Sequence, residues 1–251
     1  MYKETNILLV QFRDDEMRAH EHACIIEHSK LKEDHITTLD ALKEAIDPMK
    51  AREYDAVLLG GSGSYCVTEK NIENLPLVHD LCRAARRARV PTLGICFGAH
   101  VMTEAFGGKV EHWPDKHETG SYEVLLDEHA ANDPIFSSIP PKYWAQMGHK
   151  DFITMLPPGA IHLAHSERAA YQAWKFPDEP TYAVQFHPEL TKDGLTTRIM
   201  FYLDKYIGDD ERALQEIIDR AQDSDDATRV LTNFMNFVEQ HRALRVKAGR
   251  G

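Results

Sequence analysis

The chain has 251 residues, enough for one large α/β domain, and its composition (43% hydrophobic, 27% charged) is that of a globular protein and excludes a disordered or membrane-spanning one. Its formal net charge of −11 argues against a nucleic-acid partner, because phosphate contacts need clustered Lys and Arg in excess. The four cysteines include no CxxC pair, so they predict neither a disulfide framework nor a metal site. The sequence shows no apolar leader, and we expect a cytoplasmic protein without a membrane partner.

The first half of the sequence predicts strands and helices that alternate. Continuous apolar runs bounded by polar residues are typical of strands buried on both faces of a parallel sheet. Apolar residues that recur at three- and four-residue steps indicate the amphipathic helices between them. The strands are expected at 7–12, 56–59 and 92–95, and the helices at 15–28, 74–88 and 98–106.

The second half predicts more strand and then a helical tail. Short apolar or alternating runs separated by Pro and Gly are expected to form strands at 122–126, 143–147, 161–164, 171–174 and 182–186. Three helical patterns follow at 195–206, 214–221 and 230–238, and all three are expected to pack on the domain. We therefore predict one domain over residues 1–251, an α/β three-layer sandwich around a mostly parallel central sheet, with extra C-terminal helices.

A cysteine lies between glycines at the junction of a predicted strand and helix, in the segment Gly94-Ile95-Cys96-Phe97-Gly98. This is the thiol counterpart of a nucleophile elbow, in which small neighbours allow a sharp turn without side-chain clashes. The N-terminus of the helix is expected to lower the pKa of the thiol. The segment predicts Cys96 as a nucleophile, although taken alone it is better explained by a buried structural cysteine.

Two further segments suit the same chemistry. His187 follows a predicted strand and could take the proton of a thiol and return it to a leaving amine, while Glu189 could orient its imidazole. Gly60 and Gly61 also follow a strand, and an acyl-transfer site needs backbone N–H groups that face the developing oxyanion. Each segment is weak evidence alone, because a lone histidine is more often structural and a Gly-Gly pair is usually a turn.

Four segments together resemble the class I, or triad, glutamine amidotransferases, and within that family the amidotransferase domain of GMP synthase. They are LLGGSGS at 58–64, VPTLGICFGAHVMTEAFGGKVE at 90–111, MGHKD at 147–151 and YAVQFHPEL at 182–190. The resemblance covers about residues 5–190 and a closing helix at about 228–241, and it leaves a helical insertion at about 206–227. It implies a flavodoxin-like fold and hydrolysis of the glutamine side-chain amide, with release of ammonia.

The resemblance also assigns roles to residues. It implies a γ-glutamyl thioester on Cys96, with His187 as the base and Glu189 as its orienter, and it needs no cofactor and no metal. Backbone donors matching Gly61 and Phe97 would form the oxyanion hole. The remaining residues are expected to bind the substrate: Gly60, His100, Gly148, His149, Lys150 and Asp151. By position alone, His149 could equally be a loop histidine whose hydrogen bonds are satisfied within the protein.

The sequence departs from the family at His100, where the family usually has a glutamine that contacts the substrate. Another γ-glutamyl compound is therefore an alternative substrate. No Ser-Gly-Gly-x-Asp-Ser pyrophosphatase loop occurs in the sequence, so we expect a stand-alone amidotransferase rather than whole GMP synthase. The insertion is expected to be a packing element rather than a partner surface.

Three functions remain open. The chain could supply ammonia to a separate synthetase subunit, hydrolyse γ-glutamyl peptides or amines without a partner, or be a catalytically silent binding or regulatory homologue. The third ranks last, because Cys96, His187 and Glu189 are all present.

Overall fold

The computed structural model describes residues 5–203 and 211–247. Within these ranges the main sheet has nine strands in the order β2-β1-β3-β4-β11-β10-β9-β6-β7, and β5 and β8 form a separate antiparallel pair. The strands are β1 (Ile7–Gln11), β2 (Ile36–Asp40), β3 (Ala56–Leu59), β4 (Thr92–Ile95), β5 (Lys109–His112), β6 (Glu118–Leu126), β7 (Lys142–His149), β8 (Asp151–Met155), β9 (Ile161–His165), β10 (Ala173–Lys175) and β11 (Thr181–Val184). The helices are α1 (Met17–Ser29), α2 (Leu75–Arg87), α3 (Phe97–Ala105), α4 (Lys192–Phe201), α6 (Glu211–Arg220) and α7 (Asp225–Lys247).

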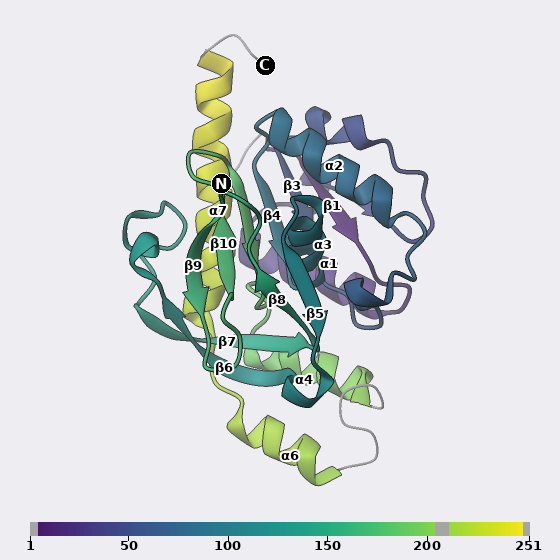
Figure 1. Ribbon diagram of the computed structural model, residues 1–251, viewed down its shortest axis with the longest axis vertical. Helices are drawn as coiled ribbons and strands as arrows, with labels where there is room; N and C mark the ends of the chain where they lie inside the picture. The colour runs from purple at the N-terminus through teal and green to yellow at the C-terminus, as the bar shows by residue number, and fades with distance from the viewer. Residues whose placement is uncertain (1–4, 204–210, 248–251) are drawn as a thin grey trace.

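Helices cover both faces of the parallel half of the main sheet, which runs from β2 to β11 (Figure 1). Side chains of successive strand residues point to opposite faces, and in β1 this divides Leu9 from Leu8. Leu9 belongs to the core that contains Ile25 of α1 and Phe234 of α7. Leu8 belongs to the core that contains Leu81 of α2 and residues of α3. The predicted three-layer arrangement is confirmed.

The predicted strands and helices are present, with ends that move by a few residues. The strand expected at 171–174 begins two residues later, and the one expected at 182–186 ends at Val184. Three strands were not anticipated: β2, β5 and β8. β2 and β5 carry exposed or half-exposed residues along most of their length, so neither has the continuous apolar run that marks a central strand.

The tail forms helices that pack on the domain. Leu195 and Ile199 of α4 contact Ala221, with Leu214 and Ile217 of α6 packed against them. α4 and α6 lie at the end of the molecule that carries the β6–β7 pair (Figure 1), and α6 packs against β6. Tyr206, included in the first tail pattern, lies outside the described residues. No helix in the described ranges is long and apolar enough to cross a membrane.

Candidate active site

The carboxyl ends of β4 and β11 bring two of the candidate residues to one edge of the sheet. The strands pair in parallel, with Ile95 opposite Val184, so Cys96 and His187 follow at the same edge. The backbone N–H of Cys96 donates to the carbonyl oxygen of Val184 at 2.8 Å. The backbone N–H of His187 donates to the carbonyl oxygen of Gln146 in β7 at 2.9 Å. Neighbouring strands therefore fix the backbone at both positions.

Cys96 occupies a strained elbow between β4 and α3. Its backbone has φ 51° and ψ −105°, in the range of φ that side chains rarely adopt. The turn requires glycine on both sides. A Cβ at Gly94 would lie 2.7 Å from the carbonyl oxygen of Gly98, and one at Gly98 would lie 2.3 Å from that of Leu59. The glycine spacing in the sequence therefore reflects a close approach of the helix to β3 and β4.

The thiol of Cys96 is buried, with 3% of the residue exposed, and burial raises its pKa to about 12. Arg13 and the backbone N–H of Phe97 act in the opposite direction, but they offset only part of this shift. The N–H at the start of the helix does lower the pKa, as expected, but the net shift is upward, because loss of solvent around the thiolate outweighs the favourable donors. At neutral pH the thiol is protonated, so a base must remove its proton during a reaction.

His187 and Glu189 form a buried pair. His187 Nδ1 lies 2.8 Å from Glu189 Oε1, and both side chains are at most 5% exposed. This contact leaves Nε2 of the imidazole for a second partner. Burial lowers the pKa of His187, with Glu189 acting against that shift. Although burial alone would raise the pKa of Glu189, His187 and Arg198 hold it well below its usual value. At neutral pH the pair is therefore a neutral imidazole oriented by a carboxylate.

Arg198 of α4 completes this cluster and was not anticipated from the sequence. Its Nη1 donates to Glu189 Oε1 at 2.7 Å and lies 3.2 Å from His187 Nδ1. The guanidinium is buried and neutralises the carboxylate that orients the histidine. Arg198 follows His187 by 11 residues and lies on a different element, so no local motif marks it.

We expect Arg198→Met to change the pH dependence of catalysis. Arg198 lowers the pKa of His187, so removing its charge should raise that pKa and move the acid limb of kcat/KM upward by about one pH unit. In the unsubstituted protein this limb lies below pH 6.5, because the pKa of His187 is lowered from that value. Arg198→Lys keeps the charge and should leave the limb in place. An unchanged limb in Arg198→Met would contradict the assignment.

A buried glutamate of α1 holds the loop that carries Gly60 and Gly61. The N–H of Gly61 donates to Glu21 Oε1 at 2.9 Å, and Arg13 Nε pairs with the same oxygen. A Cβ at Gly60 would lie 2.7 Å from Glu21 Oε2, and one at Gly61 would lie 2.9 Å from Cε1 of His187. A side chain at either position would therefore displace Glu21 or His187. In this conformation the Gly61 N–H, expected to face an oxyanion, is engaged by Glu21.

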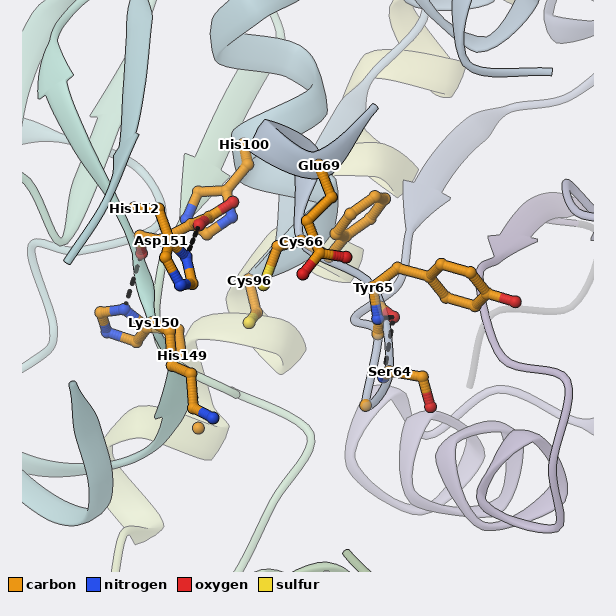
Figure 2. Close-up of a pocket in the computed structure, with 14 residues that line it drawn as sticks. Ser64, Tyr65, Cys66, Glu69, Cys96, His100, His112, His149, Lys150 and Asp151 are labelled. Carbon is orange, nitrogen blue, oxygen red and sulfur yellow. Dashed lines mark hydrogen bonds and ion pairs between the residues drawn. The ribbon is translucent and has the colours of Figure 1, made fainter. Parts of the chain in front are cut away.

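A cavity of about 280 Å³ opens beside Cys96 (Figure 2). Its volume is near the lower end of the range typical of small-ligand sites. The loop 62–66 lines one side, and Glu69 and His112 also line the cavity together with these predicted site residues: Cys96, Phe97, His100, Gly148, His149, Lys150 and Asp151. His187 lines a smaller neighbouring cavity that shares Ser62 and Gly148 with this one. Most of the predicted site residues thus line two adjoining cavities, with Cys96 in one and His187 in the other, whereas Gly60, Gly61 and Glu189 line neither.

Two of the predicted substrate-binding residues are hydrogen-bonded within the protein. His149 Nδ1 lies 2.9 Å from the carbonyl oxygen of Asp151, and its Nε2 lies 2.9 Å from Glu118 Oε2. The carboxylate of Asp151 accepts from the backbone N–H and the hydroxyl of Thr68. His149 therefore fits the alternative of a satisfied histidine that supports the cavity wall.

His100 lies in the first turns of α3 and is buried. Its Nε2 is hydrogen-bonded to Oε1 of Gln185, which lies two residues before His187. Burial lowers the pKa of His100 to about 4, so the imidazole is neutral at pH 7 and donates this hydrogen bond. The residue is thus an uncharged part of the cavity wall, tied to the segment that carries the candidate base.

Comparisons with known proteins identify the family of this chain. The model of the family "Glutamine amidotransferase class-I" matches residues 14–203. One subunit of the GMP synthase (glutamine-hydrolyzing) of Methanosarcina acetivorans is 32% identical over 165 residues, which cover 64% of this chain and 80% of that protein. GMP synthase (glutamine-hydrolyzing) of Thermosipho melanesiensis is 32% identical over 145 residues, 58% of this chain but 26% of that protein. The chain thus spans about a quarter of the length of the Thermosipho GMP synthase but most of the length of the Methanosarcina subunit.

The fold is shared with solved structures. A glutamine amidotransferase of Thermotoga maritima aligns with a TM-score of 0.72 at 22% identity, covering 94% of this chain and 98% of the other. A protein of Thermoplasma acidophilum, whose assignment as a GMP synthase subunit is provisional, aligns with a TM-score of 0.69 at 18% identity. The alignment covers 96% of this chain and 98% of the other. Both alignments cover more than nine-tenths of this chain.

Proposed function

We propose that this chain, which belongs to the class-I glutamine amidotransferase family, hydrolyses the side-chain amide of glutamine through a thioester on Cys96. One observation carries the proposal: the strained elbow of Cys96 and the buried His187–Glu189 pair follow two strands that are paired in register. A glutamine amidotransferase needs a nucleophile and a base at one place, and Cys96 and His187 at these two strand ends are proposed for those roles.

The proposed reaction begins with proton transfer from Cys96 Sγ to Nε2 of His187. The sulfur attacks the amide carbonyl carbon, and a C–S bond forms as the carbonyl π electrons move to oxygen. When the C–N bond breaks, the imidazolium returns the proton and ammonia leaves. Water then attacks the thioester with His187 as the base, giving glutamate and the free thiol. The neutral thiol and neutral imidazole described above are the protonation states that this sequence requires.

The oxyanion is proposed to bind backbone donors. Phe97 is the residue after the nucleophile, and its backbone N–H is hydrogen-bonded to the Cys96 sulfur. This N–H would therefore lie near the carbonyl carbon of a substrate that Cys96 attacks. The N–H of Gly61 would be the second donor, but it must first leave Glu21 Oε1. Full stabilisation of the oxyanion therefore requires the loop of Gly60 and Gly61 to move.

Ammonia from this site is proposed to serve a separate synthetase subunit. Relatives of which this chain covers most of the length are named as one subunit of GMP synthase, and that naming supports a second subunit here. Hydrolysis of other γ-glutamyl compounds without a partner is the second candidate, supported by His100 on the cavity wall.

An ammonia-release screen of the purified protein over glutamine and a panel of γ-glutamyl compounds tests the proposal. We expect slow glutamine hydrolysis that accelerates when the cognate synthetase is added. Fast turnover of one γ-glutamyl peptide or amine without a partner would favour the second candidate. No ammonia from any compound, together with failure of a thiol-reactive glutamine analogue to label Cys96, would favour a catalytically silent homologue.

We expect His100→Gln to shift preference toward free glutamine. A glutamine side chain offers an amide NH₂ and a carbonyl oxygen at the cavity wall, whereas the single N–H donor of neutral His100 is already bonded to Gln185. The ratio of kcat/KM for glutamine to that for γ-glutamyl-p-nitroanilide should rise by about tenfold or more. His100→Ala, which removes the ring without replacing its polar group, is the control. Equal ratios in all three proteins would show that this position does not set specificity.

A further inference from the structure

A second cluster of reactive side chains lies in the Cys96 cavity, apart from the His187–Glu189 pair. Cys66, His112 and Asp151 each offer one ligand atom, and these atoms all lie within 4.8 Å of one another. All three line the cavity that Cys96 also lines. Figure 2 shows Cys66 between the His112–Asp151 pair and Glu69, with Cys96 next to it in this view. The mechanism proposed above uses neither Cys66 nor His112.

The backbone holds the three residues together although they are far apart in the sequence. His112 ends β5 and Asp151 begins β8, and the two are register partners in that antiparallel pair. Their side chains are in contact, with His112 Nδ1 2.7 Å from Asp151 Oδ1. Thr68, two residues after Cys66, donates its backbone N–H and its hydroxyl to the Asp151 carboxylate. The turn that carries Cys66 is therefore fixed against the other two ligands.

We propose that Cys66, His112 and Asp151 form a binding site for Zn²⁺ or a similar transition-metal ion, whose occupancy blocks the Cys96 cavity. A thiolate, an imidazole and a carboxylate are the ligand types that Zn²⁺ takes, and three protein ligands leave the fourth tetrahedral position for water. This donor set selects against Mg²⁺ and Ca²⁺, which require oxygen ligands. Binding replaces the proton of the Cys66 thiol, which passes to solvent.

The location of the site predicts inhibition. His112 has a side chain that is 38% exposed, so an ion can reach the cluster from solvent. A metal ion and its water would then occupy space in the cavity where a substrate approaches Cys96. The inhibitory effect rests on the proposed hydrolysis, whereas metal binding does not. The two are therefore measured separately.

Metal binding is tested with Co²⁺ under reducing conditions on the Cys96→Ala variant, in which the candidate nucleophile cannot be a ligand. We expect one Co²⁺ per chain with a near-ultraviolet thiolate-to-cobalt absorption band, and displacement of the ion by Zn²⁺. Adding Cys66→Ser should remove the band, and adding His112→Gln should weaken binding by at least about tenfold. His112→Gln changes a partly exposed side chain, so it tests the site even if Cys66→Ser disturbs the fold.

The matched control is Cys24→Ser, since Cys24 also lies beside a histidine, His20, but outside the cavity. The band should persist in Cys24→Ser. A band that survives Cys66→Ser, or the lack of any band in Cys96→Ala, would overturn the metal site. Inhibition is tested only in proteins that keep Cys96. For each protein, ammonia release is measured with a chelator and with Zn²⁺, and the ratio of the two rates is compared with that of the unsubstituted protein. This ratio should fall toward one in His112→Gln, and a ratio equal to that of the unsubstituted protein would show that Zn²⁺ acts elsewhere.

Discussion

Replacing Cys96 with alanine is expected to lower glutamine hydrolysis by about 10⁵-fold or more, because removal of a nucleophile leaves only substrate positioning and oxyanion contacts. The substitution suits the site structurally. Alanine has the same Cβ as cysteine, so it adds no new clash at φ 51°, and the thiol it removes is a single buried group. Steady-state ammonia release gives the activity, and far-ultraviolet circular dichroism with a thermal melt shows whether the fold is kept.

Cys82 provides a matched control for the Cys96 substitution. It is also buried, with 1% of the residue exposed, but it packs between α2 and the sheet as a core side chain. Cys82→Ala should keep the activity and lose stability, as expected of a small cavity in a core. Normal turnover by Cys96→Ala would exclude the thioester mechanism, whatever the behaviour of the control.

Replacing His187 with alanine is expected to cost about as much activity as replacing Cys96, since nucleophile and base act as a unit. Glu189→Gln should cost less, about 10⁴-fold, because it removes the group that orients the base rather than the base itself. Comparison of kcat for the two variants, measured at the same pH, tests this order. Equal losses would mean that Glu189 does more than orient His187.

The loss of folding stability is expected to rank the two variants in the opposite order, with the larger loss in Glu189→Gln. Glu189→Gln leaves the guanidinium of Arg198 buried without its charged partner, and loss of one member of a buried pair costs about 3–5 kcal/mol. His187→Ala leaves the Glu189–Arg198 contact of 2.7 Å in place. Denaturant unfolding of the two variants should therefore show the larger loss in Glu189→Gln. This opposite ranking separates the catalytic role of each residue from its structural role.

The parallel half of the sheet could be predicted from sequence because its strands are buried on both faces. β3 and β4 are buried at every position, so their apolar runs coincide with the strands observed. β5 could not be predicted, since two of its four residues are exposed and it pairs only with β8. The second half of the chain has short strands whose registers depend on partners that are distant in the sequence. Pairing with such partners sets the ends of β10 and β11.

The candidate site divides in the same way. Cys96 and its flanking glycines are marked by a local turn, and His187 and Glu189 are two residues apart. Arg198 and Glu21 reach the site from helices whose own sequences do not indicate it. The contact between Glu21 and Gly61 joins residues 40 positions apart. The pKa of Cys96 could not be predicted either, because it depends on how completely the fold excludes water from the thiol.

Under the proposed mechanism, the hydrogen bond between Glu21 and Gly61 would also limit how strongly a synthetase partner can stimulate glutamine hydrolysis. If Gly61 is an oxyanion donor as proposed, turnover needs a second arrangement in which its N–H is released from Glu21, and only that arrangement has both donors. For every 1.4 kcal/mol, roughly, of free energy that favours the Glu21-bound arrangement, the population with a released Gly61 N–H falls about tenfold. A partner that binds only the released arrangement can recover that factor and no more. The ratio of stimulated to unstimulated turnover would therefore measure the free energy that keeps Gly61 on Glu21.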